Sequence, residues 1–465
     1  MVAVKNAKKY AAITRRVTSA EMVRHCTEGD LWVAVQGKVY NVTSMMWMSL
    51  SLWLPHHPGG NLPLLGLAGQ DVTDAFVAYH LASAWRGLNR HHVASLSVHA
   101  ISDVSCDYRR MVADFARAGL FDRDKGRGCA ASLCAMAALL AGAVWLVLAT
   151  ASVAAHMAAA FMLGFLWMQS GFLDHDSGHY ASCTCALLCE HLADSAEMVV
   201  AGISIGWWKR THNAPHIACN SLDHDPDVQH MPLFAVSPRL FASLTSFFYR
   251  RVMRFDAAAR FLVSYQHWTF YPVMCVARVN LFAQSLLLLL SRSTRVPGRA
   301  GVAVFWVWYP WLVSRLPGGA WERAAFVLLS FAVTGVQHVQ FCLNHFSAGT
   351  YVGRPRGDGW FQKQTRGTLD VECPPWMDWF HGGLQFQVEH HLFPRCHLRR
   401  VAPLVRELCR KHGLPYQSCG FWEANVRTIR TLRDAAMKAR AVGAAASGGS
   451  DVPKNLVWEA VNTHG

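Results

Sequence analysis

Two uncharged segments that follow each other almost without a break constrain the fold of this 465-residue chain most strongly. Residues 129–150 contain no charged side chain, and a second apolar run covers residues 153–173. A helix rises about 1.5 Å per residue, so each segment is long enough to cross the ~30 Å hydrocarbon core of a bilayer. The pair therefore predicts a helical hairpin in a membrane. The composition agrees, since 52% of the residues are hydrophobic and only 16% are charged.

The formal net charge of +14 favours a partner that is either a nucleic acid or a membrane surface. The basic residues flank apolar runs and the sequence carries no nucleic-acid-binding motif, so we expect the lipid bilayer, and no nucleic acid, as a partner. Lys and Arg are frequent at the base of the predicted hairpin and absent from its tip. By the positive-inside rule, the segment that follows residue 173 lies on the cytosolic side.

Three clusters of histidines lie beside apolar segments, and their members are His175 and His179, His212 and His216, and His390 and His391. An imidazole at a membrane is costly unless it has a partner, and a metal ion is a partner that several clusters can share. The first two pairs have i, i+4 spacing, which places both rings of a pair on one helix face. Many neutral imidazoles with few carboxylates suit a first-row metal such as iron.

The third cluster differs because its histidines are adjacent. On a helix their side chains point about 100° apart, so they can reach two different ions. Gln387 lies one turn before them and adds an amide oxygen on the same side. Asp176 and Glu389 are placed to accept hydrogen bonds from ligating rings. A single histidine pair is usually structural, but three clusters at membrane boundaries favour a metal centre.

A separate histidine motif lies near the N-terminus, where His57 precedes Pro58-Gly59-Gly60 and His80 follows 23 residues later. A tight Pro-Gly-Gly turn can present an imidazole from a rigid backbone, and a second axial ligand must come from another element. This stretch resembles cytochrome b5, also in residues 37–43 upstream. The resemblance implies a haem b held by His57 and His80. Residues 44–56 are longer and more apolar than the connection expected there.

The three clusters resemble the histidine boxes of the membrane fatty-acid desaturase superfamily, and Gln387 together with the N-terminal haem motif marks the front-end desaturases. The resemblance is strongest to plant desaturases of sphingoid long-chain bases that act at the Δ8 position, and it extends from about residue 28 to about residue 435. The stretches that carry it are Trp207–Asn213, Ile217–Asp227, Ser264–Trp268 and Gly382–Pro394.

The resemblance implies two non-haem irons, which are held by the six box histidines and Gln387. His345 is a further candidate ligand. Oxygen (O₂) is the implied co-substrate, and electrons would come from NADH-cytochrome b5 reductase through the haem. The implied reaction removes two hydrogens from an unactivated chain of a membrane lipid and leaves a double bond.

Two alternatives stay open at this point. A front-end acyl-lipid desaturase that acts at the Δ6 position would share these boxes, so the substrate can be a long-chain base, a ceramide or an acyl lipid. Pro215 stands where the second box of the family carries its middle histidine. A catalytically impaired homologue, which would be a non-catalytic membrane haem protein, is therefore the other alternative.

We expect a multi-domain chain, in which a small α+β domain precedes an α-helical transmembrane domain with about four spanning helices. Its expected parts are an N-terminal extension over 1–17, a cytochrome b5-like domain over 18–100, a linker with an amphipathic helix over 101–128, the membrane desaturase domain over 129–435 and a flexible tail over 436–465.

The resemblance implies a multi-pass protein of the endoplasmic reticulum membrane, with the haem domain and the histidine boxes on the cytosolic side. An even number of the apolar segments 267–290, 300–316 and 324–343 must then span. Basic residues between the first and second of these segments favour the last two as the spanning pair.

Overall fold

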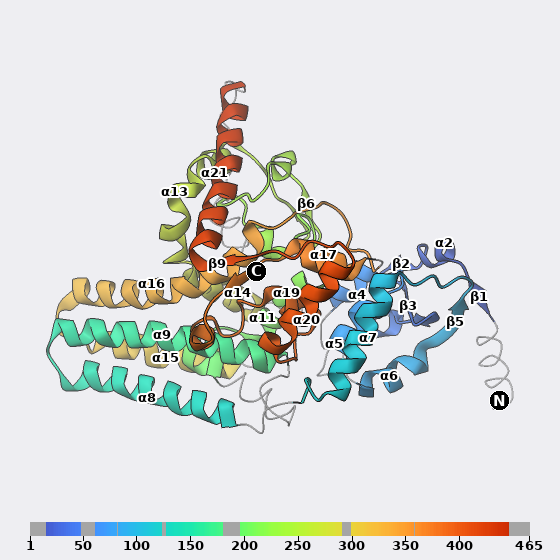
Figure 1. The fold of residues 1–465 in the computed structure, drawn as a ribbon. Coiled ribbons are helices and arrows are strands. Elements are labelled where there is room, and N and C mark those ends of the chain that lie inside the picture. The colour runs from blue at the N-terminus through green and yellow to red at the C-terminus, as the bar shows by residue number, and fades with distance from the viewer. Residues whose placement is uncertain are drawn as a thin grey trace.

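The computed structural model of the chain describes residues 15–47, 61–80, 82–122, 127–179, 196–290, 299–357 and 359–445. Its N-terminal unit is built on a five-stranded sheet with the strand order β1-β5-β4-β3-β2 (Figure 1). The strands are β1 (Arg16–Val17), β2 (Cys26–Thr27), β3 (Asp30–Val35), β4 (Lys38–Asn41) and β5 (His92–Leu96). The helices of this unit are α2 (Ser19–Met22), α3 (Thr43–Trp47), α4 (Asn61–Leu67), α5 (Thr73–Tyr79), α6 (Ala82–Leu88) and the 3₁₀ turn η2 (Asn89–His91).

The hairpin between β3 and β4 follows directly from its turn residues. Gln36 and Gly37 both have positive φ, of 51° and 75°. Two successive residues of this kind make the tight turn whose twist matches that of a strand pair. The turn joins β3 to β4 as an antiparallel pair, in which Val35 lies opposite Lys38.

Helix α7 (Asp103–Arg117) leads from this unit to the membrane part and packs against α5. Ser102 caps it by accepting a hydrogen bond from the backbone N–H of Ser105 at 3.2 Å. Its polar face is exposed, and Tyr108 and Phe115 are buried on the other face. Helix α7 lies within residues 101–128, where the sequence predicts a linker with an amphipathic helix.

Within the described residues, three helices are long and apolar enough to span a membrane: α8 (Arg127–Ala149, of which residues 129–149 are apolar), α9 (Val153–Gly178) and α16 (Gly319–Phe346). A fourth span is possible if α13 (Ala257–Met274) and α14 (Arg278–Leu290), which meet at an angle of 80°, are taken together. The apolar helix α15 (Arg299–Ser314) is shorter. In Figure 1, α8, α9, α15 and α16 run side by side. The predicted hairpin is α8 with α9.

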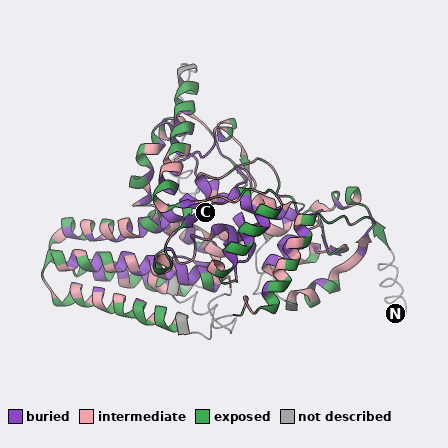
Figure 2. Ribbon diagram, viewed as in Figure 1, coloured by how far each residue is buried: buried purple, intermediate pink, exposed green. Residues whose placement is uncertain are grey.

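Figure 2 shows exposed residues along the outer faces of these helices, and large apolar residues are among them. Trp145 on α8, Trp268 on α13 and Val307 on α15 are 62%, 73% and 71% exposed. Exposed apolar surface on this scale is what a lipid-facing belt requires. Between the helices the packing is close, because α9 has Gly164 where a Cβ atom would lie only 2.5 Å from the carbonyl oxygen of Ser330 on α16.

The remaining elements cover one end of the helical bundle. They are η3 (Ala196–Ala201), α11 (Ile205–His212), α12 (Pro215–Ala218), η4 (Pro226–Val228), η5 (Pro238–Ala242), β6 (Thr245–Ser246), β7 (Arg251–Val252), α17 (Trp360–Gly367), β8 (Asp370–Glu372), η6 (Pro375–Met377), α18 (Asp378–His381), α19 (Gln387–Leu392), α20 (Leu398–Lys411), β9 (Ser418–Gly420) and α21 (Phe421–Ala445). Helix α21 packs along α13 and continues past residue 435, where the sequence predicted the start of a tail.

One hydrophobic core joins the N-terminal unit to this covering layer. It contains Phe76 from α5, Tyr108 from α7, Ile217 from α12, Trp360 from α17 and Leu392 from α19. The N-terminal unit is therefore packed against the elements that surround the bundle end. The expected class, a small α+β unit followed by a helical membrane part, is confirmed.

Candidate metal centre

Five helices end at one place and bring the predicted ligands together. These ligands are His175 and the C-cap residue His179 from α9, His212 from α11, His216 from α12, His345 from α16, and Gln387, His390 and His391 from α19. Each helix directs its ligands by ordinary helical spacing, so the local sequence pattern fixes the direction of each side chain. Tertiary packing then brings the helix ends to one site.

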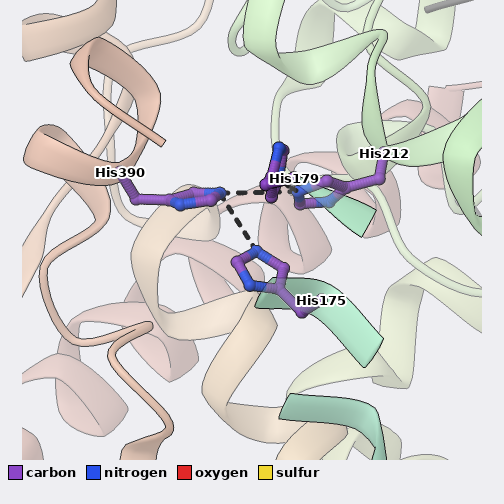
Figure 3. A group of neighbouring side chains, drawn as sticks. All are labelled: His175, His179, His212 and His390. Carbon is purple, nitrogen blue, oxygen red and sulfur yellow. Dashed lines mark hydrogen bonds between the residues drawn. The ribbon is translucent and has the colours of Figure 1, made fainter. Parts of the chain in front are cut away.

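Four of the histidines form a compact group, which we call the four-histidine group: His175, His179, His212 and His390 (Figure 3). One ring nitrogen from each lies within 4.8 Å of the others. The Nε2 atom of His390 lies 3.1 Å from that of His175 and 3.4 Å from that of His212. Nitrogens bound about 2.1 Å from a common ion stand roughly 3 Å apart. The spacing therefore fits ligands that share one metal.

The other four ligands form a second group beside the first, which we call the amide group: His216, His345, Gln387 and His391. The Nε2 atom of Gln387 lies 3.2 Å from the Nε2 atoms of both His345 and His391. A half-turn of the amide presents its oxygen, the atom that a metal would bind, at the same place. His216 connects the two groups, since its Nε2 atom lies 3.0 Å from that of His212.

Two buried amides orient the rings of the amide group. The Nδ1 atom of His345 lies 3.0 Å from the side-chain oxygen of Asn220, and that of His391 lies 2.8 Å from the side-chain oxygen of Gln364. An N–H donated from Nδ1 leaves the lone pair on Nε2, which faces the centre of the group. Neither Asn220 nor Gln364 can be predicted as a partner from the sequence, because a lone amide has no regular spacing to the ring that it contacts.

The two acidic partners predicted from the sequence behave differently. Asp176 lies 3.3 Å from the Nδ1 atom of His175, as predicted. The prediction for Glu389 is wrong: its carboxyl group points away from the histidines and accepts a hydrogen bond from the Tyr416 hydroxyl at 2.9 Å. Asp370 also contacts that hydroxyl. Burial, and then the Asp370 carboxyl, raise the pKa of Glu389 well above its usual range.

Pro215 is buried at the first position of α12. A proline is tolerated there, since the first N–H groups of a helix have no partner within the helix. The backbone around His216 is therefore regular. The side chain of Pro215 carries no donor atom, and the amide group contains three imidazoles where the four-histidine group contains four.

The rings that lie outside the membrane helices have the protonation state that ligation requires. Burial, followed by the neighbouring histidines, lowers the pKa of five of them well below its usual range. These are His179, His212, His216, His390 and His391. They are neutral at pH 7, with a lone pair available to a metal. The donor set of imidazoles and one amide fits iron.

A cavity of about 140 Å³ opens beside both groups and is lined by His175, His212, His345 and Gln387. Most of its wall is apolar and comes from the membrane helices, including Trp167, Leu281 and Phe341. A mostly apolar space that ends at candidate metal ligands suits an alkyl chain better than a polar substrate.

The haem motif is only partly within the described residues. His80 follows α5, and its Nδ1 atom lies 3.0 Å from the carbonyl oxygen of Phe76. That contact assigns Nε2 as the ring nitrogen for axial ligation, and the Phe76 ring stacks on the imidazole at 4.2 Å. His80 thus fits a haem ligand. His57 and residues 48–56 of the apolar connection lie outside the described residues.

Comparison with known proteins identifies both parts of the chain. The model of the fatty acid desaturase family matches residues 151–420, more than half of the chain, and that of the cytochrome b5-like heme/steroid binding domain matches residues 18–97. A Delta(8)-fatty-acid desaturase 2 of Arabidopsis thaliana is 55% identical over 97% of this chain and 98% of its own length. An acyl-lipid (9-3)-desaturase of Borago officinalis is 51% identical over 98% of this chain and 100% of its own length.

A more distant relative, a Delta 8-(E)-sphingolipid desaturase of Emericella nidulans, is 39% identical over 61% of this chain and 54% of its own length. The two matched families imply a haem in the N-terminal part and iron in the membrane part. With the geometry of the histidines, the matches show that the chain is a membrane oxidoreductase that belongs to the fatty acid desaturase family and carries an N-terminal cytochrome b5-like domain.

Proposed function

We propose that this protein introduces a double bond at the Δ8 position of sphingolipid long-chain bases, with O₂ as co-substrate. Electrons reach the membrane part through the fused cytochrome b5-like domain. The observation that carries the proposal is that the four-histidine group and the amide group lie together, and that His175, His212, His345 and Gln387 from these groups line a mostly apolar cavity between membrane helices.

The proposed site holds two non-haem irons. The four-histidine group would bind one of them, and the amide group, including His345, would bind the other. When bound, iron supplies the oxidising power that removes hydrogen from an unactivated methylene group. The polypeptide holds the ligand rings neutral and oriented, and the cavity walls hold the chain and exclude water.

The choice of a long-chain base over an acyl lipid rests on the relatives. The Arabidopsis protein is named for Δ8, and the fungal relative is named for both Δ8 and a sphingolipid. The Borago relative, named for an acyl lipid, supports a front-end acyl-lipid desaturase as the second candidate function. Free long-chain bases and ceramides are both compatible with the proposal.

Lipid analysis after expression in a host that lacks Δ8 unsaturation tests the proposal. We expect a new double bond at C8 of the long-chain bases and unchanged fatty acids. New double bonds confined to fatty acids would reject the long-chain base as substrate. A host lipid profile with no new double bond, together with purified protein that contains one haem iron and no other iron, would support a non-catalytic haem protein.

We also propose where in the cell this protein lies and how it is oriented. The protein would lie in the endoplasmic reticulum membrane, with both metal groups and the haem domain on the cytosolic side, where NADH-cytochrome b5 reductase can reach the haem. The arrangement in Figure 1 supports this, since the N-terminal unit and the ligand-bearing helices lie at the same end of the bundle. Domain limits of 18–100 and 129–435 belong to the same proposal, with His57 and His80 as the haem ligands.

A further inference from the structure

One side chain of the N-terminal unit reaches the metal centre. Tyr79 immediately precedes the haem-ligand candidate His80. Its hydroxyl oxygen lies 2.7 Å from the carbonyl oxygen of His391 and 3.0 Å from the carbonyl oxygen of His216. The Nδ1 atom of His216 is 3.4 Å away. A single phenol therefore contacts two ligands of the amide group, which come from two different histidine boxes.

The phenol acts here as a hydrogen-bond donor. Both nearby oxygens are carbonyl acceptors, and the shorter distance assigns the proton to the His391 carbonyl. The ring is held edge-on between His216 at 5.5 Å and Trp360 at 5.9 Å.

Packing between the two parts of the chain does not by itself explain why the Tyr79 hydroxyl contacts His216 and His391. Other hydrogen bonds across the same interface join Gln70 to Pro355 at 3.1 Å and to Gly357 at 2.9 Å, and none of these residues is a candidate ligand. The Tyr79 contact instead joins the residue next to a haem ligand to the backbone of two metal ligands. It is a short covalent and hydrogen-bonded connection between the two predicted redox sites.

We propose that Tyr79 is a positioning residue for electron transfer from the haem domain to the amide group, an inference that rests on the proposed function. With haem and iron bound, each transfer would carry one electron from the reduced haem to the amide group, while Tyr79 keeps its proton and no bond of the polypeptide changes. Two such electrons and two protons from solvent, with the two hydrogen atoms removed from the substrate, would balance the reduction of O₂ to two waters.

The test is the Tyr79→Phe variant, which keeps the ring and removes the hydroxyl. Purified protein loaded with haem and iron is reduced, mixed with O₂ and a ceramide that has a saturated long-chain base, and followed by the haem absorbance. We expect haem reoxidation to slow by about tenfold, because misplacing reacting groups by ~1 Å can lower a rate by ~10²-fold. Haem content, non-haem iron content and the haem spectrum should match those of the wild type.

Tyr108→Phe is the matched control. The Tyr108 hydroxyl donates to the carbonyl oxygen of Leu392 at 3.0 Å, one residue beyond His391, and is fully buried in the same interface. It has no haem ligand as a neighbour, so its loss should leave the reoxidation rate unchanged. A wild-type rate in Tyr79→Phe, or an equal slowing in both variants, would overturn the proposal.

Product analysis of the same reactions separates the two claims. Wild-type protein that reoxidises its haem without forming a double bond, in a free long-chain base as well as in the ceramide, contradicts the proposed function. A normal rate of haem reoxidation in Tyr79→Phe, with product formed, contradicts only the role of Tyr79.

Discussion

At the scale of single residues, the side chains behind the ligands should matter almost as much as the ligands. Gln364 is fully buried and connects the second histidine cluster to the third. Its side-chain oxygen accepts a hydrogen bond from the His391 ring, and its side-chain nitrogen donates one to the carbonyl oxygen of His216 at 2.9 Å. Gln364→Met keeps the length of the side chain and removes both bonds. We expect the affinity for non-haem iron to fall by about 10–100-fold, the usual effect of losing such a partner. The measurement is the amount of non-haem iron bound per haem when the free iron concentration is limiting.

Gln266→Met is the control for that substitution. Gln266 is also fully buried, and its amide bonds the backbone of Ala235 and Leu432, away from the ligands. It should lower stability without lowering iron affinity. A similar loss of iron in both variants would mean that Gln364 acts on the fold alone.

Pro215 gives a prediction in the opposite direction. Because it starts α12 and adjoins His216, a histidine at this position would add an imidazole beside the amide group. We expect Pro215→His to raise non-haem iron per haem and the yield of unsaturated product. Pro215→Ala separates the new ligand from the loss of the proline ring. If Pro215→His and wild type hold equal iron and give equal yield, position 215 does not supply a ligand in this chain.

The sequence predicted the histidines and missed the residues that hold them, for a physical reason. Ligands on one helix face recur at i, i+4, so the pair His175 and His179 can be recognised from its spacing in the sequence. Gln364 and Asn220 act singly, and their partners lie 27 and 125 positions away. Only the folded chain brings such pairs together.

At the scale of elements, the contact between α9 and α16 is the packing that aligns His175 with His345. A Cβ atom on Gly164 would lie 2.5 Å from the Ser330 carbonyl oxygen, and backbone cannot move aside as a side chain can. We expect Gly164→Ala to destabilise the protein by about 1–3 kcal/mol, the range for overpacking. Thermal unfolding in detergent, followed by size-exclusion chromatography, measures this.

Gly142→Ala on α8 is the matched control. The atom it would meet is the terminal methyl group of Met162, a flexible side chain that can adopt another rotamer. Its unfolding midpoint should stay near that of the wild type. Equal losses in the two variants would contradict the importance of the α9–α16 contact.

The change of direction between α13 and α14 is a feature of the elements that hydropathy cannot predict. The apolar run 267–290 is long enough to span, yet α13 ends at Met274 and α14 continues at 80° to it. Arg278, at the start of α14, is buried with its guanidinium 4.3 Å from the Trp167 ring and donates to the Ala201 carbonyl. A count of apolar residues carries no information on such a turn of direction.

At the scale of the whole molecule, the position of the N-terminal unit depends on a close approach at Gly357. A Cβ atom there would overlap the carbonyl oxygen of Asp71. We expect Gly357→Ala to separate the loops, to break the bond from its N–H to Gln70, and to increase hydrogen exchange in α5. Gly87→Ala on α6, where a Cβ atom meets nothing within 4 Å, is the control. Unchanged exchange in α5 of Gly357→Ala would contradict this account.

The division into a haem part and a membrane part could be predicted from motifs, since each motif is local. The way the two parts meet could not, because the shared core is made of residues such as Phe76 and Leu392 that look like any other core residue in sequence. Tyr79 is an example: beside His80 it reads as part of the haem motif, and its partners are in the other half of the chain.

A core that spans both parts has a consequence for the protein at low abundance. If the haem carrier is packed in place, the internal electron step is first-order in a single molecule, and its rate does not fall when the protein is diluted in the bilayer. Only re-reduction of the haem by a separate protein then depends on crowding and collision. In a cell that makes few copies of this protein, the internal step would therefore be as fast as in a cell that makes many.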